Sequence, residues 1–211
     1  MSSIKDSNLA SKGAEEINWA TRQMQVLEEI SNEFAVSKPL NGLNIGACMH
    51  VTKETANLMM TLKTAGANIA LCASNPLSTN DSVAAFLAEN DIEVHAIRGV
   101  SNDEFFKHLN LVLDSNPDIT MDDGADLVTL LHTDRSEISV LGSMEETTTG
   151  VIRLKSMEKN NKLRFPVVAV NDSDTKHLFD NRFGTGQSSM DGIVRATDLL
   201  IAGLNVVVFG F

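Results

Sequence analysis

The sequence predicts an α/β fold with three layers, in which helices cover both faces of a mainly parallel β-sheet. Short apolar runs rich in Val and Ile alternate with segments of helical periodicity, and this alternation is typical of parallel β-α-β units. The 211 residues, of which 43% are hydrophobic, suffice for one domain with a well-formed core. Polar clusters follow several of the apolar runs, as they do where an open parallel sheet binds a ligand at the carboxyl ends of its strands.

The expected elements can be placed in order along the chain. We predict a first helix over about 13–34, because helical spacing places Ile17, Met24, Leu27 and Ile30 on one apolar face. A Ser-Lys-Pro turn at 37–39 then ends it. Runs of β-branched and other apolar residues predict strands at 43–48, 68–72, 93–97, 119–121, 139–141 and 167–170. Helical periodicity predicts helices at 52–65, 80–89, 103–113, 124–132, 145–159 and 188–202, and a last strand is expected from Asn205 to the end of the chain.

The charge and cysteine content limit the class of protein. The formal net charge of −11 argues against a nucleic-acid partner, because a phosphate backbone attracts basic surfaces. The two cysteines, Cys48 and Cys72, lie in apolar runs and are expected to be buried thiols of a reducing compartment. The first residues lack the apolar stretch of a signal peptide, and no run approaches the roughly 18 apolar residues of a membrane span. We therefore expect a cytoplasmic protein with neither a nucleic-acid nor a membrane partner.

Four polar clusters lie at or shortly after the ends of predicted strands, at 49–54, 122–126, 145–149 and 171–176. Because the carboxyl ends of parallel strands share one edge of a sheet, we expect these clusters to converge on one pocket. No cluster has the Asp spacing of a calcium-binding loop or a Cys/His set with zinc-ligand spacing, so no metal site is expected.

Each cluster also has a purely structural interpretation. Thr52 could cap the helix that follows His50, with Glu54 favoured by the helix dipole. Lys176 and Asp180 are four residues apart, so on a helix they could form a surface ion pair.

The two acidic clusters also have structural alternatives to a functional role. The segment 122–124 could be a turn before a helix. The cluster 145–149 could be a first helical turn, although its three threonines also offer hydroxyls and backbone N–H groups to a polar cofactor.

Five blocks of sequence, taken in this order and spacing, point to a family. They are Cys48-Met49-His50-Val51-Thr52, Asp122-Asp123-Gly124, Glu145-Glu146-Thr147-Thr148-Thr149-Gly150, Asn171-Asp172-Ser173-Asp174-Thr175-Lys176 and Phe179-Asp180-Asn181. This set resembles adenosylhomocysteinase. The resemblance implies a Rossmann-like domain and the reversible hydrolysis of S-adenosyl-L-homocysteine to adenosine and L-homocysteine. The route would be NAD-dependent 3′-oxidation, elimination of homocysteine and addition of water.

The resemblance also implies roles for individual residues. The catalytic residues would be His50, Asp123, Glu146, Lys176 and Asp180. Substrate contacts would come from Thr52, Glu54, Asp123, Glu146, Lys176 and Asp180, and NAD contacts from Thr147, Thr148, Thr149 and Asn181. Lys176 would accept the proton of the ribose 3′-hydroxyl, with Asp180 and Glu146 positioning it. Asp123 is the first choice for proton transfer at C4′, and His50 for the leaving sulfur and the incoming water. The division of proton transfer among Asp123, His50 and Asp180 stays open.

The resemblance covers about half of the family's chain. We expect a substrate-binding domain at 1–185, followed at 186–211 by an interdomain helix and the first strand of a truncated NAD-binding domain. The family's Gly-x-Gly-x-x-Gly turn would follow that strand, and here only its first glycine, Gly210, is present. The isolated chain is therefore expected to be inactive, and the intact enzyme to be a homo-oligomer, a tetramer in this family.

Three positions depart from the common pattern of the family. Ala125 stands where a second glycine is common, Asn80 where many members carry glutamine, and Thr185 where animal members often carry cysteine. None of the three removes an expected catalytic group. The alternative to an enzyme is a catalytically silent adenosylhomocysteinase-like module for binding or interaction, and the intact catalytic set argues against it.

Overall fold

The computed structural model describes residues 2–209. The chain divides into two compact units, Met1–Ala169 and Val170–Phe211. The division into domains after residue 185 stays a prediction.

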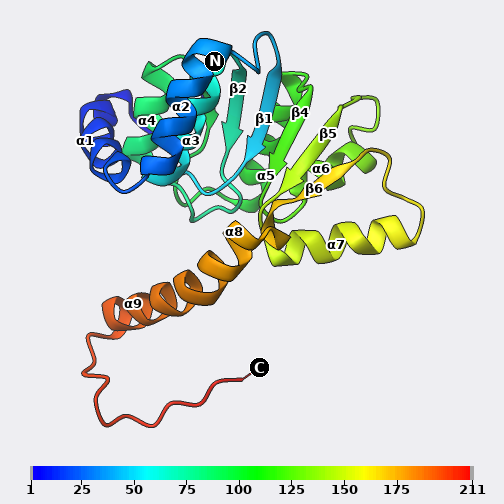
Figure 1. The fold of residues 1–211 in the computed structure, drawn as a ribbon. Helices are drawn as coiled ribbons and strands as arrows, with labels where there is room; N and C mark the ends of the chain where they lie inside the picture. Colours follow the sequence, from blue (N-terminus) through cyan, green and yellow to red (C-terminus); the bar gives the residue numbers. More distant parts are fainter. Residues whose placement is uncertain (1, 210–211) are drawn as a thin grey trace. The chain divides into compact units, whose positions relative to one another are not determined.

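A six-stranded, entirely parallel sheet forms the centre of the first unit (Figure 1). Its strands are β1 (Asn44–Cys48), β2 (Asn68–Cys72), β3 (Glu93–His95), β4 (Ile119–Asp122), β5 (Gly142–Glu145) and β6 (Val167–Ala169). They are ordered β3-β2-β1-β4-β5-β6, so the chain moves outward to one edge, returns to the centre and moves to the other edge. The predicted α/β class with a parallel, Rossmann-like sheet is therefore confirmed.

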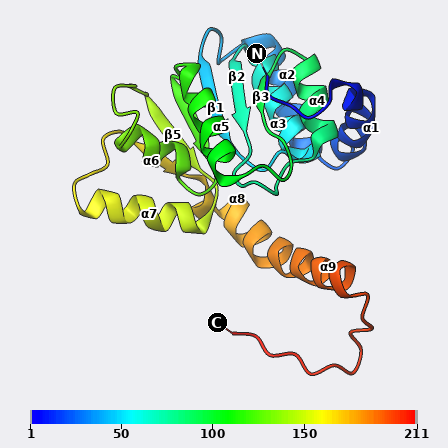
Figure 2. The same cartoon turned by 180° about the vertical axis from the view of Figure 1, so that it is seen from behind.

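Helices cover both faces of this sheet. They are the short η1 (Ser7–Leu9), α1 (Ala10–Thr21), α2 (Gln25–Ser37), α3 (Lys53–Thr64), α4 (Asp81–Glu89), α5 (Asn102–Asp114), α6 (Asp126–His132) and α7 (Thr148–Lys159). Successive strand residues point to opposite faces, and the core divides accordingly. Ile69 and Leu71 of β2 join the cluster under α1, α3 and α4, whereas Ala70 and Cys72 join the cluster under α5 and α6. Figure 2, seen from behind, shows α5 and α6 on this second face. Both cysteines are buried free thiols, as predicted.

The predicted helix over 13–34 is wrong, because the chain breaks into α1 and α2. The interruption lies at Arg22 to Met24, where Met24 leaves the helical region with φ −118° and ψ 47°. Both helices pack on α3, but α1 also packs on α4. The predicted residues therefore do not form one continuous apolar face, since Ile17 of α1 is buried but Ile30 of α2 is 38% exposed.

The predicted strand at 139–141 is also misplaced, because β5 begins at Gly142. Pairing with β4 sets this position, with Ile119 opposite Gly142 and Asp122 opposite Glu145. The apolar Val140 instead packs into the core before the strand begins. As a result Glu145 is the last strand residue, and α7 begins only at Thr148.

The second unit is helical. It contains η2 (Val170–Asp172), α8 (Asp174–Lys176), a π-helical stretch η3 (His177–Gly184) and α9 (Thr185–Thr197). The helix predicted at 188–202 thus begins and ends earlier than expected. The predicted last strand does not form over 205–209, because no described residue pairs with it; Gly210 and Phe211 lie outside the described residues. Over residues 2–209, no helix has the length and apolarity needed to cross a membrane.

Candidate functional site

The order of strands in the first unit marks one place on the sheet. β1 and β4 are neighbours, but the chain leaves them toward opposite edges, and ligands bind beside the carboxyl ends of strands at such a reversal. His50 lies two residues after the end of β1, and Asp123 directly follows β4. The topology therefore brings two predicted catalytic residues to the point where a site is expected.

His50 and Asp123 form a direct pair. The Nε2 atom of His50 lies 3.0 Å from Oδ2 of Asp123, whose side chain is 10% exposed. Ser74 completes the arrangement: its hydroxyl donates to Oδ2 of Asp123 at 3.1 Å and lies 3.0 Å from Nδ1 of His50.

Ser74 is a site residue that the sequence prediction missed. A signal for it exists in the strand register, where Cys48 of β1 pairs with Cys72 of β2. His50 and Ser74 each lie two residues beyond this pair, so they reach the same edge side by side.

The hydrogen bonds favour the charged form of His50. The single hydroxyl proton of Ser74 goes to Asp123, so Ser74 can only accept from Nδ1, and Nε2 must donate to the carboxylate. Both ring nitrogens then carry protons. The hydrogen bond to Asp123 accordingly raises the pKa of His50 above its ordinary value of 6.5, against the opposing effect of burial.

Asp123 is the centre of the cluster and is held ionised. Burial is the largest influence and acts to raise its pKa. The hydrogen bond and the charge of His50, together with hydrogen bonds from Glu146 and Ser74, outweigh burial and lower the pKa. A side-chain hydrogen bond joins the carboxyl groups of Asp123 and Glu146. The structure thus brings His50, Asp123 and Glu146 together from the ends of β1, β4 and β5.

A hollow of about 500 Å³ lies beside His50. Its lining residues are Glu16, His50, Val51, Thr52, Lys53, Glu54, Ser78, Thr79, Asn80 and Arg98. The size is in the range of small-molecule pockets. Thr52 caps α3, since its hydroxyl accepts from the Thr55 N–H at 3.3 Å, so the capping interpretation is confirmed. Glu54 lies in the first turn of α3, where the helix dipole favours its charge.

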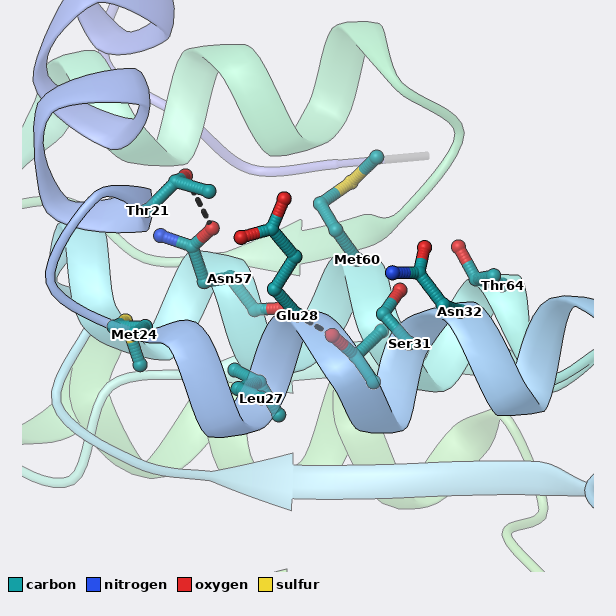
Figure 3. A pocket seen from close by; sticks show the side chains of 10 residues that line it. Thr21, Met24, Leu27, Glu28, Ser31, Asn32, Asn57, Met60 and Thr64 are labelled. Carbon is teal, nitrogen blue, oxygen red and sulfur yellow. Dashed lines mark hydrogen bonds between the residues drawn. The ribbon is translucent and has the colours of Figure 1, made fainter.

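A second, smaller hollow of about 140 Å³ lies between α2 and α3 (Figure 3). Its polar side chains bond to one another, as in the 2.7 Å hydrogen bond from Thr21 to Asn57. No predicted site residue lines it. Because His50 lines the larger of these two hollows, that hollow is the candidate binding pocket.

The three threonines lie at the beginning of α7. Thr147 immediately precedes the helix, and its hydroxyl makes no capping bond to the helix. Thr148 and Thr149 occupy the first turn, where backbone N–H groups and the helix dipole favour a negatively charged ligand. The acidic residues Glu145 and Glu146 precede the helix, so they do not form its first turn.

The remaining predicted site residues form a cluster within the second unit. The Nζ atom of Lys176 donates to Oδ1 of Asn171 at 2.9 Å and to Oδ1 of Asn181 at 2.7 Å. It also lies 3.5 Å from Oδ2 of Asp180, so the predicted pair four residues apart is formed. The prediction that this cluster shares a crevice with His50 stays a prediction.

Comparison with known proteins identifies the family of the chain. A family model described as S-adenosyl-L-homocysteine hydrolase matches residues 1–141 and 134–201. An S-inosyl-L-homocysteine hydrolase of Methanococcus maripaludis is 56% identical, covering 100% of this chain and 51% of the relative. Adenosylhomocysteinases of Pyrococcus abyssi and Aquifex aeolicus are 53% and 54% identical, each covering 99% of this chain and 50% of the relative. The chain spans about half the length of these curated relatives, and it belongs to the S-adenosyl-L-homocysteine hydrolase family.

Proposed function

We propose that the complete protein catalyses the reversible hydrolysis of S-adenosyl-L-homocysteine to adenosine and L-homocysteine. The observation that carries this proposal is the cluster of His50, Asp123 and Glu146 at the reversal of strand order. The cluster presents a proton donor and a proton acceptor 3.0 Å apart, beside a pocket large enough for a nucleoside.

The reaction requires removal of a proton from carbon, because an unactivated thioether resists direct attack by water. NAD, when bound, supplies reversible oxidation at the ribose 3′ carbon, which acidifies the neighbouring C4′–H. The residues at the beginning of α7 fit such a cofactor, since Thr147 has a hydroxyl without a capping bond and the helix end favours phosphate. We assign cofactor contacts to Thr147, Thr148, Thr149 and Asn181.

Asp123 and His50 would divide the proton transfers of elimination. Asp123, held ionised in a largely buried position, suits removal of the proton at C4′. His50, whose charged form is favoured, suits donation to the departing homocysteine sulfur. Once neutral, its imidazole can accept a proton from the incoming water. Glu146, bonded to Asp123, would orient the ribose hydroxyls.

Lys176 would accept the proton of the 3′-hydroxyl. Its Nζ atom is oriented by Asn171, Asn181 and Asp180, so its direction is set before a substrate binds. Asp180 would thereby position the lysine, while Asn181 would contact both the lysine and the cofactor.

The purine base would occupy the hollow beside His50, with Thr52 and Glu54 at its edge. A carboxylate there can accept from the 6-amino group of adenine or from the N1–H of hypoxanthine. Because relatives of similar identity carry both names, S-inosyl-L-homocysteine is the second candidate substrate. We favour the adenosyl compound, and the assay below includes both.

The test uses the complete gene product with NAD and measures homocysteine release from each substrate. We expect turnover of S-adenosyl-L-homocysteine, with kcat reduced by roughly 10²–10⁴-fold in Asp123→Asn and KM little changed. Glu158→Gln, an exposed carboxylate on α7, is the control and should leave both constants unchanged. Preference for the inosyl substrate would reassign the substrate. A complete protein without turnover of either would favour the silent binding module.

We further propose a cytoplasmic location and a homotetrameric assembly for the complete protein. The resemblance to the S-adenosyl-L-homocysteine hydrolase family supports both proposals. Size-exclusion chromatography with light scattering measures the assembly directly.

A further inference from the structure

The interior of the first unit contains a second carboxylate that the proposed mechanism does not use. Glu145, at the end of β5, has no exposed surface. Its Oε1 atom accepts from the N–H groups of Gly124 and Thr147, each at 3.0 Å, and its Oε2 atom accepts from Ala125 at 2.9 Å. A buried carboxylate is costly unless it is hydrogen-bonded, and here backbone N–H groups surround it.

These three N–H groups belong to the two segments that present the site. Gly124 and Ala125 directly follow Asp123, and Thr147 directly follows Glu146. One carboxylate therefore connects the segment after β4 to the segment after β5. Its position therefore sets the distance between the Asp123 and Glu146 carboxyl groups.

The Glu145 carboxyl group is tightly packed against α7. A Cβ atom placed on Gly150 of α7 would collide with the carboxyl carbon and both oxygens of Glu145. The first turn of α7 therefore approaches the carboxylate with no side chain between them, and even one methyl group there would displace it.

The neighbouring carboxyl group, that of Asp122, does not connect the segments after β4 and β5. It lies opposite Glu145 in the sheet and is buried, and it accepts a hydrogen bond from the backbone N–H of Val128 at 3.0 Å. Its Oδ1 atom has no hydrogen-bond partner among the described residues. Burial raises the pKa of Asp122 to about 8, so it is neutral at pH 7. Burial also raises the pKa of Glu145, but the three backbone N–H groups act in the opposite direction and favour its charged form.

We propose that Glu145 is a positioning residue, whose carboxylate holds the segments after β4 and β5 together and so sets the geometry of Asp123, Glu146 and His50. The chemical role of that geometry rests on the proposed function, but the geometry itself does not.

Gly150→Ala is the most direct test, because it displaces Glu145 while leaving every charge in place. The titration of the His50 ring, followed by NMR on this chain and assigned with His50→Gln, reports the contact with Asp123. We expect the raised pKa of His50 to move back toward 6.5 in Gly150→Ala and in Glu145→Gln. Combining the two changes should add little to either alone, since both act through one carboxylate.

Two controls match these changes. Gly192→Ala places a methyl group on a helix where no atom lies within 4 Å, and Glu158→Gln removes an exposed charge from α7. Neither should alter the His50 titration. An unchanged titration in folded Gly150→Ala would overturn the proposal.

Hydrogen exchange on the unaltered chain provides a measurement that needs no variant. The amides of Gly124, Ala125 and Thr147 lie in loops, yet they should exchange much more slowly than unbonded loop amides. Rapid exchange at all three would overturn the proposal even if both variants failed to fold.

Activity of the complete gene product then separates the two proposals. With a functional hydrolase, Gly150→Ala should lower kcat by on the order of 10²-fold with a smaller change in KM, as for a misplaced catalytic group. If Asp123→Asn removes activity while Gly150→Ala alters neither kcat nor the His50 titration, the positioning role is wrong and the function stands. A shifted titration in a protein without hydrolase activity supports the positioning role and contradicts the function.

Discussion

At the scale of residues, two pairs of adjacent acidic side chains have opposite roles. In each pair the strand residue, Asp122 or Glu145, is buried, and the next residue, Asp123 or Glu146, is partly accessible at the edge of the sheet. Alternation along an extended chain separates neighbours in this way. The sequence blocks predicted the accessible residues but not the supporting role of the buried ones.

The pair of His50 and Asp123 should make the stability of the chain depend on pH. Because the pKa of His50 is raised in the folded chain, protonated His50 stabilises the fold below about pH 6.5. This stabilisation is lost as the pH rises through the pKa of His50 in the folded state. Because the pKa of Asp123 is lowered in the folded chain, ionised Asp123 stabilises the fold above about pH 3.8. This stabilisation is lost as the pH falls through the pKa of Asp123 in the folded state. The two contributions coincide between about pH 4 and 6.5.

We therefore expect Asp123→Asn to lower the free energy of unfolding by about 1 kcal/mol near pH 5.5, a modest value because His50 is half exposed. The loss should be smaller at pH 8.5. Urea unfolding at both pH values measures it, with Asp103→Asn on the exposed start of α5 as control. A loss that grows toward pH 8.5 would contradict the assigned protonation states.

At the scale of elements, the turn between β4 and α6 determines where Asp123 points. Gly124 has a φ of +120° and Ala125 has a φ of +63°, so two successive residues adopt backbone conformations that favour glycine. The methyl group of Ala125 is buried, which offsets part of the strain.

Gly124→Ala should destabilise the chain by about 1–3 kcal/mol through backbone strain. No collision contributes, because the nearest atom to an added Cβ would be Oδ2 of Asp126 at 3.8 Å. Ala125→Gly is the matched control: relief of strain and loss of a buried methyl nearly cancel, so stability should change by less than about 1 kcal/mol. Thermal unfolding compares the two, and equal stability would show that Gly124 is not required.

At the scale of the whole molecule, strand order assembles the site from distant parts of the sequence. His50, Ser74, Asp123 and Glu146 follow four different strands, yet β2, β1, β4 and β5 are consecutive in the sheet. Parallel pairing aligns their carboxyl ends, which explains why one hydrogen-bonded cluster spans about 100 residues of chain.

The 211 residues, assayed alone with NAD, should release no homocysteine from S-adenosyl-L-homocysteine. The reason is that they correspond to about half the length of the curated hydrolases they match. A sensitive thiol assay measures the release, with the complete gene product as positive control. Turnover by the chain that Lys176→Ala abolishes would contradict this expectation.

The sequence by itself determined the alternation of strands and helices, the polar clusters at strand ends and the family, because these depend on periodicity and on short blocks of residues. It placed β2 at its observed bounds and β1 within one residue. Tertiary structure decided where α1 ends, where β5 begins, that Ser74 joins His50, and that Glu145 lies inside. Each of these depends on pairing or packing between segments far apart in the chain, and local patterns do not contain the register of that pairing.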